Sequence, residues 1–260
     1  MRLHQDGLAR WLASFSTLSG VLVLHESRRT LLHRVHRELR RAGVVGFADV
    51  LAFRAYYQLL LARRDRAWEA RALRDMVLRY PPVPPDTREA HERSPNSASA
   101  ERFIRDCAPD MTLALCKNLL ADRIWGIPPL GTFVMHPGIC PEYRNAHGCF
   151  WALANDDLGK VGMTLLKIDR GVDTGPVFGY FRCAYDEVAE SHAVIQNRVV
   201  LDNLEQIRRR LVEIGRGRAR PLGTDGRSSA VWGQPRLSYY LRWKRRAWRR
   251  HRAGDRAGVP

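Results

Sequence analysis

The 260-residue sequence contains no Cys-x-x-Cys pair, and its five cysteines are an odd number. Zinc knuckles use closely spaced cysteine pairs and disulfide frameworks use even sets, so neither kind of structure is expected. The sequence also contains no His-x-x-x-His motif, and we predict no metal site. We interpret the cysteines as buried, reduced thiols.

Long apolar runs are absent as well. No uninterrupted apolar segment reaches the roughly eighteen residues that a membrane-spanning helix needs, and Leu18–Leu24 is broken by Ser19 and Gly20. The first residues include Arg2 and Asp6 and develop no apolar core before a small-residue cleavage site, which argues against a secretory signal. We therefore expect a soluble, cytoplasmic protein without a transmembrane segment.

Positive charge is abundant. The formal net charge is +16, which would attract RNA, anionic membrane surfaces or phosphorylated substrates without distinguishing among them. Much of this charge lies between Arg242 and Arg252, where Trp243 and Trp248 interrupt the basic run. The segment is a candidate contact for nucleic acid or a membrane interface, but we favour a frayed, solvated basic helix.

The order of the expected elements indicates the fold class. Strand-like and helix-like segments alternate, which is typical of an α/β protein with a mostly parallel sheet covered by helices on both faces. The Pro-Pro-Val-Pro-Pro segment at 81–85 ends one long helix, and a loop is expected from there to about Ser94. The expected strands are 20–24, 111–115, 131–135, 161–168 and 176–185, and the expected helices are 30–42, 47–80, 99–107, 119–125, 148–154 and 190–214.

Two polar residues follow expected strands and are candidates for chemistry. His136 comes after 131–135 and is held by Pro137, while Asp173 lies in a Gly-Val-Asp-Thr-Gly loop after 161–168. An aspartate beside a histidine can orient the imidazole and raise its basicity, so the two could form an acid–base dyad. Spacing alone equally allows a hydrogen-bonded structural histidine and a turn aspartate.

Longer motifs around these residues resemble a known family. The segments His-Pro-Gly-Ile-Cys-Pro-Glu-Tyr-Arg-Asn (136–145), Phe-Trp-Ala-Leu (150–153) and Val-Gly-Met-Thr-Leu-Leu-Lys-Ile-Asp-Arg-Gly-Val-Asp-Thr-Gly (161–175) resemble the folate-dependent formyltransferases. That family includes methionyl-tRNA formyltransferase, glycinamide ribonucleotide formyltransferase and the sugar N-formyltransferases. The similarity covers about residues 94–214, so we expect a formyltransferase-like domain at 1–215 and a basic tail at 216–260.

The resemblance implies a Rossmann-like sheet and an enzyme of one-carbon metabolism that takes a formyl group from 10-formyltetrahydrofolate. His136 would stabilise the oxyanion formed when an amine attacks the formyl carbon, and Asp173 would orient His136 and help to relay the amine proton. By the same resemblance, the pterin pocket would be lined by Lys117, Asn118 and Leu119 and by the backbone around Asp169, Gly171 and Val172.

The sequence departs from the family in two places. The family has an asparagine two residues before the histidine, whereas Val134 stands there and its side chain cannot form hydrogen bonds. Asn145 could supply a substitute amide to the site or could cap its own loop. Family members also begin with a β-strand, whereas residues 1–12 are helix-like, so the first strand of the sheet is expected to be missing.

Three functions fit these observations. The first is formyl transfer to the amine of a small molecule, with a nucleotide-linked amino sugar as one candidate acceptor. The second is a degenerate relative that binds folate or a partner with little transfer, which Val134 favours. The third is a tRNA-directed formyltransferase, ranked last because the residues after Gly215 are too few and too polar for the β-barrel domain expected of that group.

Overall fold

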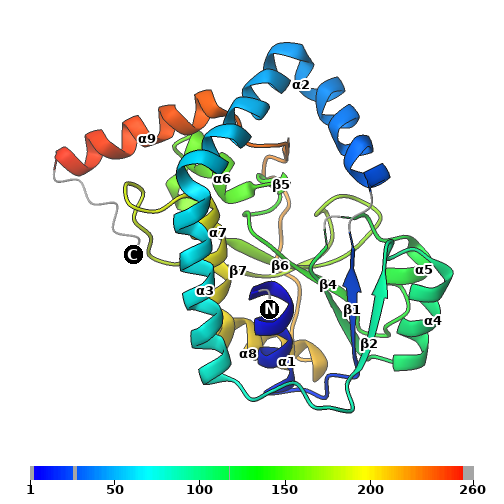
Figure 1. The fold of residues 1–260 in the computed structure, drawn as a ribbon. Helices are drawn as coiled ribbons and strands as arrows, with labels where there is room; N and C mark the ends of the chain where they lie inside the picture. The colour runs from blue at the N-terminus through cyan, green and yellow to red at the C-terminus, as the bar shows by residue number, and fades with distance from the viewer. Residues whose placement is uncertain (1–2, 26–27, 117, 254–260) are drawn as a thin grey trace.

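The computed structural model describes residues 3–25, 28–116 and 118–253 (Figure 1). Four strands form the main sheet in the order β3-β4-β6-β7. The remaining described strands form two two-stranded sheets, β1-β2 and β5-β8. Their bounds are β1 Gly20–Leu24, β2 Arg88–Glu92, β3 Met111–Ala114, β4 Gly131–His136, β5 Arg144–Asn145, β6 Met163–Lys167, β7 Val177–Phe181 and β8 Val231–Trp232.

Pairing within the described strands is mixed, with parallel pairs in the majority. β1 with β2, β3 with β4 and β5 with β8 are parallel, whereas β6 is antiparallel to both β4 and β7. The expected α/β, Rossmann-like class with a parallel-dominated sheet arrangement is confirmed. The antiparallel position of β6 matters for the site, because it sets His136 at the end of β4 opposite Thr164.

Helices alternate with these strands along the chain. α4 packs against β1 and β2, whereas α7 contacts β6 and α8 contacts β7. The helical elements are η1 Leu3–Gly7, α1 Leu8–Ala13, α2 Arg28–Tyr56, η2 Tyr57–Leu61, α3 Ala62–Arg79, α4 Ala98–Cys107, α5 Asp122–Trp125, α6 Gly148–Ala154, η3 Leu158–Lys160, α7 His192–Leu201, α8 Leu204–Gly215 and α9 Leu237–Arg252.

Most expected strand and helix positions agree with the structure, but β2, β5 and β8 were not expected as strands. Residues 88–92, expected to lie in a loop, form β2, whose side chains are Arg-Glu-Ala-His-Glu. A strand that pairs mainly through its backbone needs no apolar alternation, so hydropathy gave no signal for it. The single helix expected at 190–214 is divided at Asn203, whose side-chain amide donates to the carbonyl oxygens of Arg182 and Val199.

The N-terminal segment is helical, as its sequence suggested. η1 and α1 precede β1, and Leu8 and Trp11 of α1 are buried in the main core. Other large, fully buried side chains of that core come from β4, α6, β6, α7 and α9: Phe133, Phe150, Leu165, Ile195 and Trp243.

A long helical run from α2 through η2 to α3 bends at Gly43. Gly43 has φ 68° and ψ 174°, which is outside the helical region and in the half of φ space that favours glycine. We expected Gly43 to end a helix, and in the structure a second helical segment resumes directly after it. Figure 1 shows the bend at the tip of α2, projecting beyond the remainder of the chain.

This run also meets the length and composition of a membrane helix. Within the described residues, Val35–Arg79 is the one helical stretch long and apolar enough to cross a bilayer by these criteria, and only 11% of its most apolar window is buried. The expectation of no such segment rested on unbroken apolar runs. A helix whose apolar stretch contains few charged residues meets these length and composition criteria even though it has no unbroken apolar run.

The segment after residue 215 was expected to be a basic tail, and its described part packs on the α/β domain instead. Tyr240, Trp243 and Ala247 of α9 are buried, so the helix is not frayed and solvated. The Trp243 indole donates to Glu187 Oε2 at 2.9 Å, and Arg250 pairs with the same carboxylate at 2.7 Å. The basic residues of this helix are evident in the sequence, whereas its buried side consists of only three residues, Tyr240, Trp243 and Ala247.

Trp243→Ala tests whether α9 belongs to the folded domain. Removing a fully buried indole leaves a cavity and removes one hydrogen bond to Glu187, so we expect the free energy of unfolding to fall by roughly 3–5 kcal/mol. The matched control is Trp248→Ala on the same helix, where the side chain is half exposed and the change should stay within about 1 kcal/mol. Denaturant titration measures both, and equal losses would contradict the packing described for α9.

Candidate functional site

The candidate site begins where β4 ends. His136 is the last residue of β4, and the chain then turns sharply through Gly138. Thr164 of β6 fixes this turn, because its hydroxyl donates to the Gly138 carbonyl at 2.6 Å and accepts from the Cys140 amide at 3.0 Å. The loop that carries the imidazole is thus attached to the neighbouring strand at two points.

Both nitrogens of His136 face oxygen atoms. Nε2 lies 2.8 Å from the Tyr143 carbonyl oxygen, and Nδ1 lies 3.5 Å from Asp173 Oδ2. A carbonyl oxygen only accepts, so the hydrogen on the neutral ring belongs to Nε2. Nδ1 therefore turns toward the carboxylate, at a distance longer than a well-formed hydrogen bond. A proton placed on Nδ1 would sit directly against Asp173.

Asp173 is the more accessible member of this pair. Its side chain is 16% exposed against 6% for that of His136. Asp173 has φ 51°, which places it in the left-handed region, and its Oδ2 accepts from the Asn145 amide at 2.7 Å. The loop ahead of it is fixed by Asp169, whose Oδ1 accepts from Gly171 N at 2.9 Å and from the Thr174 hydroxyl at 2.7 Å.

The structure brings Asn145 to the site through its backbone rather than its side chain. The backbone amide donates to Asp173, as described, whereas the side-chain Nδ2 donates to the Trp232 carbonyl of β8. The side chain that we considered as a substitute amide donor is thus used to hold β5 against β8. Its remaining contribution to the site is to orient the Asp173 carboxylate.

Val134 lies on the same face of β4 as His136, two residues earlier. It packs against a small apolar cluster of Cys140, Leu166 and Val177 and lies opposite Leu166 in the β4–β6 ladder. The position that carries an asparagine in the resembled family is therefore an apolar contact here. Burial raises the pKa of the neighbouring Cys140 thiol, so this cysteine is a packed, protonated group rather than a nucleophile.

The two segments expected to line a pterin pocket lie next to one another. Arg170 pairs with Asp122 at 2.8 Å, which joins the 169–175 loop to the start of α5 just after Asn118 and Leu119. Leu119 is 63% exposed and offers apolar surface beside these loops, which suits a flat aromatic ring. Lys117, expected in the same pocket, lies outside the described residues.

Sequence reasoning missed a group of residues that covers the outer side of the site loop. Arg227 donates to both carboxylate oxygens of Glu142, at 3.0 and 2.6 Å, and also to the Tyr180 hydroxyl. Burial opposes ionisation of Glu142, but the hydrogen bonds from Arg227 outweigh it and lower the pKa of the carboxyl. Tyr180 in turn donates to the Cys140 carbonyl at 2.8 Å.

An aromatic stack continues this cover. Trp232 of β8 lies between Tyr143 and Trp151, with ring centroids 5.6 and 4.9 Å away, and its indole donates to the Glu142 carbonyl at 2.8 Å. Tyr143 is the residue whose carbonyl faces His136. The sequence signal for this aromatic stack is the presence of tryptophans at 151 and 232. Their spacing along the chain gives no indication that the two rings are in contact.

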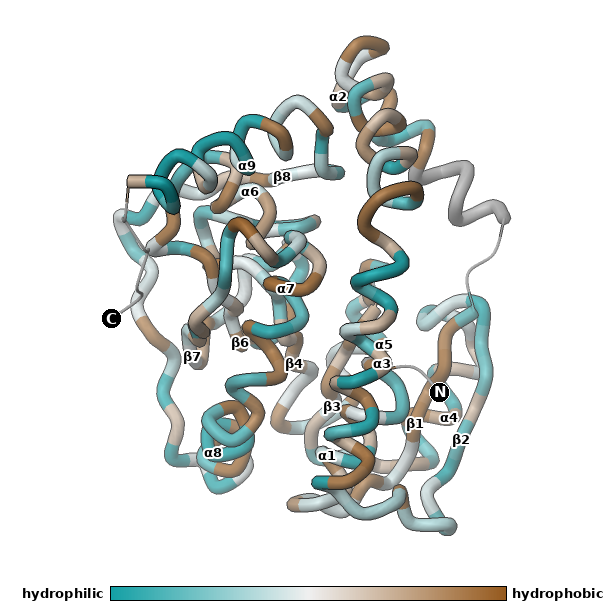
Figure 2. The backbone as a smooth tube through the Cα atoms, turned by 60° about the vertical axis from the view of Figure 1, so that its left-hand side comes forward, coloured by the Kyte–Doolittle hydropathy of each residue, from teal (hydrophilic) through white to brown (hydrophobic). Residues whose placement is uncertain are grey.

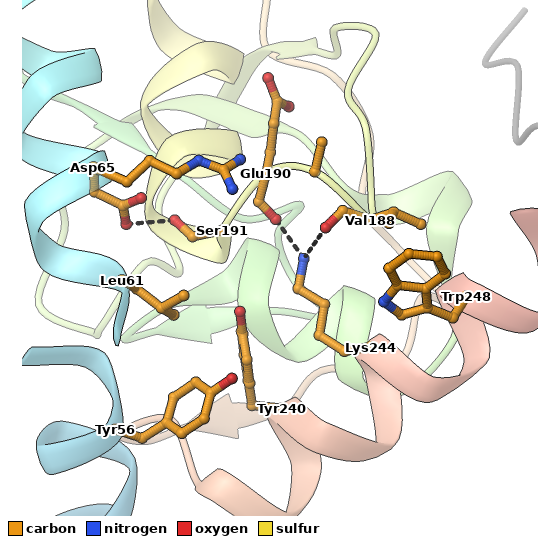
Figure 3. A pocket seen from close by; sticks show the side chains of 11 residues that line it. Tyr56, Leu61, Asp65, Val188, Glu190, Ser191, Tyr240, Lys244 and Trp248 are labelled. Atoms are coloured by element: carbon orange, nitrogen blue, oxygen red, sulfur yellow. Dashed lines mark hydrogen bonds between the residues drawn. The ribbon is translucent and has the colours of Figure 1, made fainter. Parts of the chain in front are cut away.

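A separate pocket of about 220 Å³ lies between η2, α3, the 188–191 loop and α9 (Figure 3). Lys244 reaches into it and donates to the carbonyls of Glu187, Val188 and Glu190. Burial lowers the pKa of Lys244 to about 8. His136 and Asp173 are not among the residues that line this pocket, so the pocket is distinct from the candidate site.

Comparisons with known proteins agree with the motif resemblance. No family model matches the chain. A methionyl-tRNA formyltransferase of Bacteroides thetaiotaomicron is 28% identical over 122 residues, which is 44% of this chain and 38% of that protein. One of Kosmotoga olearia is 31% identical over 86 residues, 33% of this chain and 27% of that protein. The chain thus spans less than half the length of these curated relatives.

Solved structures of formyltransferases are similar at lower identity. A sugar N-formyltransferase from a Shewanella species matches with a TM-score of 0.45 and 15% identity, covering 54% of this chain and 56% of the other. A 4-N formyltransferase from Francisella tularensis matches with a TM-score of 0.47 and 12% identity, covering 60% of this chain and 67% of the other.

Gly138→Ala tests the close packing behind His136. A Cβ at Gly138 would lie 2.6 Å from the Tyr143 carbonyl oxygen and 2.7 Å from His136 Nε2, so it would separate these two atoms. We expect the free energy of unfolding to fall by roughly 1–3 kcal/mol. Gly159→Ala is the matched control, because a Cβ there meets nothing within 4 Å. Thermal and denaturant unfolding of both variants gives the comparison, and an unchanged Gly138→Ala protein would contradict the geometry.

Proposed function

We propose that this chain, which carries a formyltransferase-family catalytic domain, transfers a formyl group from 10-formyltetrahydrofolate to the amine of a small molecule. The observation that supports this most strongly is the approach of His136 Nδ1 to Asp173 Oδ2 at 3.5 Å, since the two residues come from separate strand-to-loop junctions. The motif resemblance and the sequence relatives point to the same reaction. By the same relationship, we place the activity in the cytoplasm.

The chemistry assigns different tasks to the two residues. 10-Formyltetrahydrofolate would supply the formyl carbon. The acceptor amine must lose a proton as its new C–N bond forms, and the bond between the formyl carbon and N10 of the donor would break, so that tetrahydrofolate leaves with a proton on N10. Asp173 is the partly exposed carboxylate, so it is the group that would receive this proton, directly or through a water. His136 lies behind it and would take up a proton on Nδ1 without moving, because the Tyr143 carbonyl holds the other side of the ring.

The folate site would use the surface between the 118–122 segment and the 169–172 loop. Exposed Leu119 would contact the pterin ring, and the backbone of Gly171 and Val172 would provide its polar contacts. Asp169 acts indirectly, because its carboxylate is already used to fix the loop through Gly171 and Thr174.

A nucleotide-linked amino sugar is the acceptor class that we favour. The described residues after 215 are built into the α/β domain through β8 and α9 and do not form a separate β-barrel. Similar solved structures include sugar N-formyltransferases, and one was determined with a UDP-linked formamido sugar and tetrahydrofolate.

A second function is favoured by a specific observation. Val134 supplies no hydrogen-bond donor, and both nitrogens of His136 already face protein oxygens. A developing oxyanion would therefore meet fewer donors than an oxyanion hole ordinarily offers, which costs roughly 3 kcal/mol per missing donor. A folate-binding relative with little transfer activity would have this arrangement.

Asp173→Asn is the direct test of the enzyme. With 10-formyltetrahydrofolate and a panel of amines that includes nucleotide-linked amino sugars, we expect kcat to fall by roughly a hundredfold or more, because the amide cannot take the amine proton. The exposed Asp86→Asn variant makes the same chemical change away from the site and should keep full activity. Folate-dependent thermal stabilisation without turnover in the unmodified chain would favour the binding protein over the enzyme.

Val134→Asn tests the missing donor. An amide at this position shares a face of β4 with His136, so we expect kcat to rise by roughly one to two orders of magnitude. The same change places a polar group in the Cys140, Leu166 and Val177 cluster, so the melting temperature should fall. Val134→Leu introduces a side chain that branches at Cγ and has the same number of heavy atoms as Asn but no amide, and it should give no gain in kcat. A gain in both variants would trace the effect to packing and contradict the donor argument.

A further inference from the structure

One side of the α2–η2 run is apolar and exposed. From Val44 to Leu60 the exposed positions carry only two polar side chains, Arg54 and Gln58. The others are Val44, Val45, Ala48, Leu51, Ala52, Ala55, Leu59 and Leu60, of which the largest are 47–85% exposed. Monomeric proteins rarely leave a continuous apolar face of this kind uncovered. In Figure 2 a hydrophobic stretch lies at the projecting bend of α2.

The other side of the same run belongs to the protein core. Val50 and Phe53 are buried, and the Phe53 ring lies 5.7 Å from that of Phe150 and 5.3 Å from that of Tyr240. A helix cannot cross a bilayer while these side chains remain packed in the protein core. The exposed side can, however, lie flat against a membrane interface.

A basic helix stands beside this apolar face. α9 contains seven Lys and Arg residues and no Asp or Glu. Arg246 and Arg250 pair with Asp156, whereas a second set faces solvent. The exposed set recurs at helical spacing and is interleaved with exposed Leu241 and Trp248: Arg242, Arg245, Arg249 and Arg252.

The two helices are fixed to one another. Asp49 of α2 accepts from the Ser238 amide at 3.0 Å and from its hydroxyl at the start of α9. Both lie at the same end of the molecule in Figures 1 and 2. The helices that carry the apolar face and the arginine row are therefore joined at this contact, and we call these two exposed sets of residues together the α2–α9 surface.

We propose that the α2–α9 surface binds the face of an anionic phospholipid bilayer. The arginine row would contact lipid phosphates, and the aliphatic side chains together with Trp248 would enter the boundary between headgroups and acyl chains. RNA would use the arginines but offers nothing to Val44, Val45, Leu59 and Leu60. A second copy of the chain would bring a second acid-free helix to the same contact, where the like charges repel.

Vesicle sedimentation with the full chain tests this proposal. Vesicles of phosphatidylcholine containing about one-third phosphatidylglycerol should bind the protein, pure phosphatidylcholine should bind it far less, and added salt should weaken the binding. Replacing Arg245 and Arg249 by Ala should lower the partition coefficient roughly thirty-fold. Replacing Leu59 and Leu60 by Gln should lower it at least about tenfold.

Matched controls distinguish binding by this surface from nonspecific effects of total charge and of exposed apolar residues elsewhere. Arg218→Ala with Arg220→Ala removes the same charge from the exposed loop after α8, and Leu78→Gln removes an exposed leucine at the far end of α3. Both should bind like the unmodified chain, and circular dichroism should show all variants folded.

Three results would overturn the proposal. The first is no binding to anionic vesicles, or equal losses in the test and control variants. The second is that the unmodified chain binds tRNA in a salt-sensitive way but binds no vesicles, and that the arginine variant loses the tRNA binding. This result would assign the surface to nucleic acid. The third is a dimer, seen by light scattering, that the Leu59 and Leu60 variant converts to monomer without any vesicle binding. Formyl transfer is measured separately, so failure here leaves the proposed reaction standing.

Discussion

The arrangement of the site depends on one buried imidazole that faces two oxygen acceptors. The Tyr143 carbonyl fixes the position of the hydrogen on His136 Nε2, and this leaves Nδ1 toward Asp173. Everything around the ring serves to keep those two acceptors in place. Thr164 attaches the loop that contains Tyr143 to β6, and the Asn145 amide holds the carboxylate. Small side chains are required behind the ring, because Gly138 has no room for a Cβ.

The outer wall of the site comes from a part of the chain far along the sequence. Arg227 forms an ion pair with Glu142, and Trp232 stacks on Tyr143. The loop after β4 is therefore held between β6 and the segment that leads to α9. Charge-assisted hydrogen bonds to a mostly buried carboxylate are stronger than exposed ion pairs, and this one is bidentate. The wall gives the site loop rigidity that its own short sequence could not supply.

The sequence allowed most elements of the α/β fold to be predicted, because their signals are local. β1, β4, α4 and α6 show clear apolar patterns and agree closely with the expected ranges. β2 has no apolar pattern, so its position could not be predicted from the sequence. The break between α7 and α8 depends on hydrogen bonds from Asn203 to Arg182 and Val199, and it could not be predicted either. His136 and Asp173 were found as motif residues. The direction of the Asn145 side chain, the Arg227–Glu142 pair and the stacking of Trp232 were missed, because each depends on a contact between segments some eighty residues apart.

The connection between β8 and α9 is only the four residues 233–236, and Trp151 donates to the first of them through its indole at 2.8 Å. The aromatic cover of the site and the basic helix are therefore joined by a short connection that is itself held to α6. A chain shortened before residue 227 would lose more than its positive charge, since the Tyr143 loop would be left uncovered on its solvent side. The smallest unit able to hold His136 in place thus extends well beyond the region of sequence similarity, to the C-terminal helix.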